Sequence, residues 1–243
     1  MKKIHTGETV YNQQSSDIPL HGFYAYDESL TGKRPAVIVV HDWSGQNEFA
    51  REKALLLAEM GYVGFALDMY GNGKEGKTKE EKVALMTPLM ANRTLLAERI
   101  LAAVHAVQSL PEVDAQKVAA IGFCFGGLCV LDLARTGEKI SGVISFHGLL
   151  QAPSSHISKK IHAKILALHG QDDPMVPPEH VQNFAEEMTT AQADWQFHIY
   201  GNTQHAFMNP LANDPELGLK YNATTSQRAW RLASDFLKKT FEV

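Results

Sequence analysis

Three residues with the chemistry of a nucleophile, an acid and a base lie in separate segments of the sequence. Cys124 is the centre of the hexapeptide GFCFGG, residues 122–127, between the apolar run VAAI and the apolar stretch LCVLDLA. The spacing G-x-Cys-x-G predicts a sharp strand-to-helix turn, because a nucleophile in strained backbone geometry needs neighbours without side chains. A thiol there also lies near a helix N-terminus, whose partial positive charge favours the thiolate. Taken alone, the hexapeptide also fits a glycine-rich turn around a buried, inert cysteine.

Candidates for the acid and the base follow two later apolar runs. HGQDDPMVP occupies residues 169–177, and GNTQHAF occupies residues 201–207. Both segments lie just beyond expected strand C-termini, where open α/β sheets gather their functional residues. Nucleophile, acid and base then occur in the order Cys124, Asp173, His205. That order is expected of an α/β-hydrolase and not of chymotrypsin-type or subtilisin-type chains.

The elements that must position these residues alternate between strands and helices. Short runs rich in valine and isoleucine are typical of buried parallel strands, and the segments between them have helical periodicity. The pattern predicts an α/β fold: a mostly parallel open sheet of about seven or eight strands with helices on both faces. Residues 9–26 predict two polar strands at an antiparallel edge of that sheet. Predicted strands are 36–40, 62–67, 117–122, 142–146, 164–168 and 195–200, and predicted helices are 48–60, 95–108, 127–134, 179–188 and 225–239.

One segment differs in composition from these alternating apolar strands and helices. Residues 71–82 (GNGKEGKTKEEK) are charged and rich in glycine, which favours a solvated loop that opens a helix over a mobile lid. Pro88 lies in the helical pattern that follows, and it should kink or break that helix because proline lacks a backbone donor.

Length and composition limit the protein class. The chain has 243 residues, 44% hydrophobic and 21% charged, which predicts one globular domain over 1–243. A net charge of −4 offers no basic stripe for nucleic acid or an anionic membrane, so neither is an expected partner. The N-terminus turns polar at once, which argues against a secretory signal. With two cysteines, neither at metal-ligand spacing, the sequence indicates a reducing compartment, and we expect the cytoplasm.

The sequence resembles the dienelactone hydrolases, small cysteine-dependent members of the α/β-hydrolase fold. The resemblance implies hydrolysis of a carboxylic ester, lactone or thioester through an acyl-thioester on Cys124. It implies no metal or organic cofactor, a small-molecule substrate as partner, and a monomer or homodimer. The matching segments are VVHDWSG (39–45), GYVGFALDMYG (61–71), GFCFGG (122–127), HGQDDPMVP (169–177) and YGNTQHAFMNP (200–210).

Further roles follow from the resemblance. The family spacing counted from Gly170 selects Asp173 over Asp172 as the acid. The oxyanion donors are expected to be the backbone N–H groups of Phe125 and Trp43. The Trp43 side chain is equally compatible with a core aromatic that anchors its loop.

Two charged residues carry weaker expectations for substrate binding. Asp42 stands where the namesake enzymes have a glutamate that pairs with the resting thiol. A carboxylate at the rim of the sheet, or a cap for the next helix, explains it equally well. Arg93 matches a position that contacts the substrate carboxylate, and a solvated helical arginine is the alternative. The family's serine beside the base and arginine four positions on are replaced here by Ala206 and Asn209.

The remaining histidines and cysteine of interest are interpreted as structural. His41, His147 and His169 follow or end predicted strands, where histidines are more often satisfied core residues. Cys129 lies in the apolar face of the helix after the elbow, and free cysteines are among the most buried residue types.

A second class of function stays open beside the enzyme. A hydrolase-fold binding module could keep Cys124 for thiol redox sensing, without catalysis. Peptidase activity ranks lower, because the chain lacks the extra domain that larger fold relatives use to select peptides.

Overall fold

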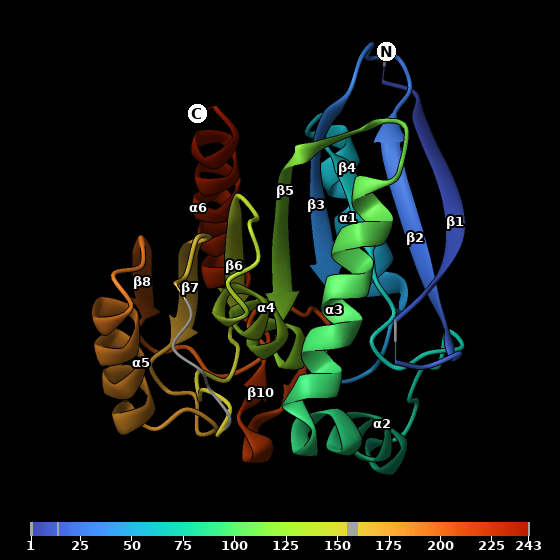
Figure 1. Ribbon diagram of the computed structural model, residues 1–243. Helices are drawn as coiled ribbons and strands as arrows, with labels where there is room; N and C mark the ends of the chain where they lie inside the picture. Colours follow the sequence, from blue (N-terminus) through green and yellow to red (C-terminus); the bar gives the residue numbers. More distant parts are fainter. Residues whose placement is uncertain (1, 14, 155–159, 243) are drawn as a thin grey trace. The chain divides into compact units, whose positions relative to one another are not determined.

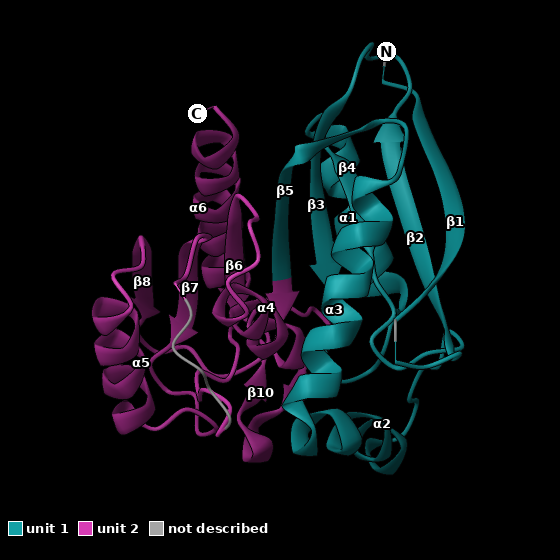
Figure 2. Cartoon of the chain, in the orientation of Figure 1, with its two compact units in different colours: residues 1–121 teal, residues 122–243 magenta. Residues whose placement is uncertain are grey.

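The computed structural model describes residues 2–13, 15–154 and 160–242 of the chain. Its principal sheet has eight strands, most of them parallel, with helices packed on it, so the expected fold class is confirmed. The chain divides into two compact units, residues 1–121 and 122–243, which Figure 2 colours separately. The boundary falls inside strand β5, and the expectation of a single domain stays a prediction.

Unit 1 contains the antiparallel edge that the sequence predicts. Strands β1 and β2 pair over nine residues each, from Ile4 opposite Asp27 to Asn12 opposite Pro19. The next pairings are antiparallel between β2 and β4 and parallel between β4 and β3. The strands are β1 (Ile4–Asn12), β2 (Pro19–Asp27), β3 (Arg34–Val40), β4 (Val63–Ala66) and β5 (Val113–Phe123), and the helices are α1 (Glu48–Glu59), α2 (Lys79–Ala91) and α3 (Arg93–Gln108).

The helices of unit 1 explain why its central strands are almost wholly apolar. Helix α1 packs on β2, β3 and β4, and α3 packs on β1 and β3. In Figure 1, α3 lies in front of these strands and α1 behind them. A strand covered on both faces needs apolar side chains at successive positions, and β3 is buried over its last five residues.

Helix α2 corrects one expectation from the sequence. Its N-terminus is a capping box between Thr78 and Glu81, so residues 71–78 form the loop that opens it. Pro88 does not break the helix, which continues to Ala91. The chain then passes through Asn92, whose side chain caps α3. Pro88 lies three residues before the end of the helix, so the i→i−4 hydrogen bond that its missing donor removes is lost from the C-terminal turn and not from the middle of the helix.

Unit 2 carries the three residues with candidate catalytic chemistry. Strand β6 pairs in parallel with β7, and β7 pairs in parallel with β8. Helix α4 packs on β6, and α6 packs on β6 and β7 from behind in Figure 1. The elements are α4 (Phe125–Arg135), β6 (Gly142–Phe146), β7 (Lys164–Gly170), α5 (Pro178–Thr190), β8 (Trp195–Tyr200), β9 (Asn213–Asp214), the 3₁₀ turn Pro215–Leu217, β10 (Leu219–Lys220) and α6 (Ala223–Phe241).

No helix within the described ranges combines the length and the apolar character that crossing a membrane requires.

Candidate active site

The elbow at Cys124 has strained backbone geometry. Cys124 joins β5 to α4 with φ 55° and ψ −114°, a conformation that residues with a side chain rarely adopt. A Cβ on Gly122 would come within 2.0 Å of the Gly126 carbonyl oxygen. A Cβ on Gly127 would lie 2.7 Å from the Gly148 Cα. Gly122 therefore allows the two sides of the turn to approach each other closely. Gly127 allows a second close approach, to Gly148, which the spacing G-x-Cys-x-G does not predict.

The Cys124 side chain sits at the start of helix α4. Cys124 is the N-cap residue, and its carbonyl accepts the N–H of Gly127 at 2.9 Å. The thiol is partly exposed, whereas Cys129 in the same helix is fully buried, which confirms the expectation that Cys129 is core. Phe125 belongs to the first turn of α4, whose N–H groups point out of the helix.

Asp173 and His205 form a buried pair. Oδ2 of Asp173 lies 2.7 Å from Nδ1 of His205, and both side chains are fully buried. Oδ1 of Asp173 accepts the N–H of Met175, so both carboxylate oxygens are held. Asp172 is exposed and lines a small polar pocket instead. The structure thus places Asp173, and not Asp172, against the histidine.

The electrostatics of His205 link it to Cys124. Burial lowers the pKa of His205, but the Cys124 thiolate and the hydrogen-bonded Asp173 carboxylate outweigh burial and raise it to about 10. Nε2 of His205 is buried, and the interaction with the Cys124 side chain is among the causes that raise the pKa of His205. The structure therefore brings Cys124, Asp173 and His205 together within unit 2, in an arrangement that can pass a proton between sulfur and imidazole.

His147, which the sequence analysis interpreted as a structural residue, is a neighbour of this group. It directly follows β6, and its Nδ1 lies 3.1 Å from the backbone N of Cys124. Its ring centroid is 5.1 Å from that of His205. The only signal in the sequence was its place after the apolar run GVISF, at the end of a parallel strand, which His41 and His169 share.

The loop after β3 holds the predicted residues Asp42 and Trp43 in unit 1. Oδ1 of Asp42 accepts the N–H of Ser44 at 2.8 Å. Asn47, and not Asp42, caps helix α1, so the helix-cap alternative for Asp42 is wrong. Trp43 is half-buried, with the Lys82 ammonium 5.5 Å from its ring centroid, so its ring is not a core aromatic.

Helix α3 carries one arginine at its first residue and another on its buried face. Arg93 is the first residue of the helix and half-buried, and its contact with a substrate carboxylate stays a prediction. Arg99 is buried, and its guanidinium donates to Gln13 and to the carbonyl of Met69. Its position on the apolar face of α3 gave no sign of these polar contacts.

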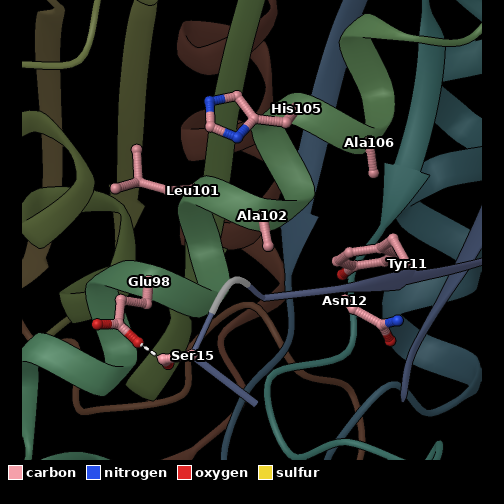
Figure 3. A pocket seen from close by; sticks show the side chains of 8 residues that line it. All are labelled: Tyr11, Asn12, Ser15, Glu98, Leu101, Ala102, His105 and Ala106. Atoms are coloured by element: carbon pink, nitrogen blue, oxygen red, sulfur yellow. Dashed lines mark hydrogen bonds between the residues drawn. The ribbon is translucent and has the colours of Figure 1, made fainter. Parts of the chain in front are cut away.

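Unit 1 also contains a pocket that none of the predicted site residues lines. Figure 3 shows it between one face of α3 and the end of β1. Its volume is about 540 Å³, and the Glu98 carboxylate at its edge accepts a hydrogen bond from Ser15. Across the described ranges, no group of three or more His, Cys, Asp or Glu side chains is arranged to hold a metal ion.

Comparison with known proteins places the chain among hydrolases. The family model described as "Dienelactone hydrolase family" matches residues 20–241. A dienelactone hydrolase-like promiscuous phosphotriesterase from metagenomic libraries is 33% identical, with a TM-score of 0.92 over 98% of this chain and 99% of that chain. A Yersinia pestis protein provisionally named carboxymethylenebutenolidase is 26% identical over 96% of this chain and 88% of its own length. The dienelactone hydrolase of Anabaena variabilis shares the fold, with a TM-score of 0.71 at 20% identity over 97% of this chain and 98% of that chain.

Proposed function

Because the chain belongs to the dienelactone hydrolase family, we propose that it hydrolyses a carboxylic ester, lactone or thioester with Cys124 as nucleophile. His205 acts as base and acid, and Asp173 orients it. The observation that carries this proposal is the buried Asp173–His205 pair, 2.7 Å long, whose histidine has its pKa raised by the charge of Cys124. This is the arrangement that generates a thiolate paired with an imidazolium.

Acylation begins with the thiolate of Cys124. The sulfur attacks the substrate carbonyl carbon, and the carbonyl electron pair moves to oxygen. When the tetrahedral intermediate collapses, the leaving alkoxide takes the proton from Nε2 of His205, and a Cys124 acyl-thioester remains. Asp173 keeps the remaining proton on Nδ1 and so fixes the orientation of the ring.

Deacylation reverses the roles with water as nucleophile. Neutral His205 accepts a proton from the water at Nε2 while the water oxygen attacks the thioester carbonyl. Collapse of this second intermediate releases the carboxylic acid and returns the thiolate beside the imidazolium. In both steps the N–H of Phe125 stabilises the oxyanion, and its position in the first turn of α4 supports this role. The Trp43 N–H stays the second donor that the family resemblance implies.

The proposal also covers the cellular compartment, the partners, the oligomeric state and the cofactors. Two free cysteines and a net charge of −4 support a cytoplasmic protein whose partner is a small-molecule substrate and not nucleic acid or a membrane. We propose a monomer or a homodimer that needs no metal or organic cofactor.

A second candidate activity is hydrolysis of phosphotriesters by the same nucleophile. It is favoured by the relative named as a promiscuous phosphotriesterase, which is 33% identical over almost the whole chain. The thiolate would attack phosphorus, expel the alcohol and leave a phosphorylated Cys124 for water to hydrolyse. A chromogenic aryl phosphotriester, assayed beside the aryl ester, tests it: turnover lost in Cys124→Ala supports it, and absent turnover refutes it.

Replacement of the nucleophile tests the main proposal. Cys124→Ala should lower kcat for a chromogenic aryl ester by on the order of 10⁶, because the three residues act as a unit. Wild-type enzyme should release a burst of product, and alkylation of the thiol should abolish it. Cys129→Ala is the matched control, since it removes a buried thiol from the same helix and should lower only the melting temperature. Turnover retained in Cys124→Ala refutes the mechanism, and wild-type protein without turnover favours the thiol redox-sensing module.

A further inference from the structure

His147 has an unusual position for a buried histidine. It is 2% exposed, directly follows strand β6, and has φ 40°, in the left-handed region that favours glycine. Its own N–H donates to the carbonyl of Leu168 at 2.8 Å, which ties it to β7. Strained residues that the surrounding structure holds in place occur preferentially at functional sites.

The first link from His147 leads to the nucleophile. The backbone N–H of Cys124 is shared between the carbonyl of Phe146 at 3.0 Å and Nδ1 of His147 at 3.1 Å. An amide N–H can donate only to an unprotonated ring nitrogen, so Nδ1 of His147 carries no proton. The neutral ring therefore has its proton on Nε2. This bond restrains the backbone of Cys124 in the strained elbow.

The second link leads to the base. The rings of His147 and His205 meet edge to face, with centroids 5.1 Å apart, and Phe207 packs against His147 at 4.9 Å. Burial, followed by the positive charge of His205, holds the pKa of His147 well below its usual range. His147 thus remains neutral at a pH at which His205 is protonated. It therefore adds no second positive charge beside the imidazolium.

The third observation is an orphaned polar atom. Nε2 of His147 is buried and has no hydrogen-bond partner among the described residues. A buried N–H without an acceptor destabilises a folded protein, so Nε2 itself gives no reason for a histidine at this position. The contacts of the other nitrogen and of the ring give the reason for a histidine here.

We propose that His147 is a positioning residue for the hydrolytic reaction, which holds the Cys124 backbone through Nδ1 and sets the ring of His205 by packing against it. The inference rests on the proposed function, since it concerns the same nucleophile and base. His147 acts through these two residues and takes no proton itself. It aligns the sulfur and Nε2 of His205, between which the proton must move in each half of the reaction.

Substitution separates this role from packing. His147→Phe keeps a ring but removes the acceptor, and kcat for the aryl ester should fall about tenfold, the size of effect expected for one lost hydrogen bond, while KM changes less than about threefold. His147→Gln offers an amide oxygen as acceptor and should recover part of that loss. The rate of Cys124 alkylation, followed from pH 5 to 9, should change its pH profile in His147→Phe.

His169→Phe is the matched control, because His169 is also buried in unit 2 and also has an orphaned ring nitrogen, but no bond to Cys124. Its kcat should stay within about threefold of wild type. If both phenylalanine variants lose only thermal stability, with kcat and the alkylation profile unchanged, His147 is structural and the inference is wrong.

A measurement on the unaltered protein keeps the inference testable if the variants do not fold. In protein with ¹⁵N-labelled histidine, His147 should be neutral with its proton on Nε2 from pH 6 to 8. A proton on Nδ1 overturns the inference. Wild-type protein that lacks hydrolysis but shows this tautomer refutes the proposed function alone, whereas hydrolysis unaffected by His147→Phe refutes the inference alone.

Discussion

His41 in unit 1 and His205 in unit 2 are equally buried, and both lie beyond strand ends, but their surroundings differ. In His41, Nδ1 contacts the carbonyl of Asp42 and Nε2 accepts the N–H of Met69, and burial lowers its pKa. In His205, Nδ1 meets the Asp173 carboxylate, and the nearby Cys124 thiolate and Asp173 carboxylate raise the pKa to about 10. Burial alone therefore does not separate a structural histidine such as His41 from one that is proposed to be catalytic. The hydrogen bonds of Nε2 and the charges near the ring distinguish the two histidines.

The largest expected effect tests this comparison directly. His205→Asn should lower kcat by on the order of 10⁶, because the only group that moves protons in the mechanism is lost. His41→Asn should instead destabilise the fold by about 1–3 kcal/mol, since it disturbs two buried hydrogen bonds. Kinetics of the aryl ester and urea unfolding of both variants measure the two effects. A folded His41→Asn protein that has lost more activity than His205→Asn would contradict the distinction.

The adjacent residues Asp172 and Asp173 provide a second test, with a smaller expected effect, of how hydrogen bonds and charges set the role of His205. Asp173→Asn should lower kcat by about 10⁴, because an amide can keep the geometry while selecting the wrong imidazole tautomer of His205. Asp172 is exposed and makes no side-chain contact with His205 among those described, so Asp172→Asn should change kcat less than about threefold. Equal losses, or a larger loss at Asp172, would show that the carboxylate facing the histidine in solution is not Asp173.

The smallest expected effect concerns specificity. Namesake enzymes hold the substrate carboxylate partly through residues that are Ala206 and Asn209 here. Loss of an arginine–carboxylate bond costs about 1.5–3 kcal/mol, so dienelactone should bind about 10- to 150-fold more weakly than in an enzyme that retains it. We therefore predict a higher kcat/KM for a short neutral aryl ester than for dienelactone. A tenfold or greater preference for dienelactone would mean that other residues, Arg93 first, replace the missing contact.

The sequence predicted the local features of the fold well. Strands β6 and β8 have the bounds that the apolar runs indicated, and the helix after the elbow extends the predicted one by two residues at its start and one at its end. Hydrophobic periodicity is a local property, and helix and strand follow from it directly. The break that the sequence allowed at Pro88 does not occur, because the effect of a proline depends on where the helix stops, and α2 continues to Ala91. That end is decided by Asn92, whose side chain caps α3.

By itself, the sequence determined the identity and order of Cys124, Asp173 and His205 and the strained turn around the first of them. These depend on residue types within a few positions of each other, above all the glycines that permit the turn. Only the tertiary structure decided which histidines lie near Cys124, because residues 124, 147 and 205 are distant in the chain and are brought together by the packing of parallel strands. For the same reason, a buried contact such as that between His147 and the Cys124 backbone has no signature in a single sequence.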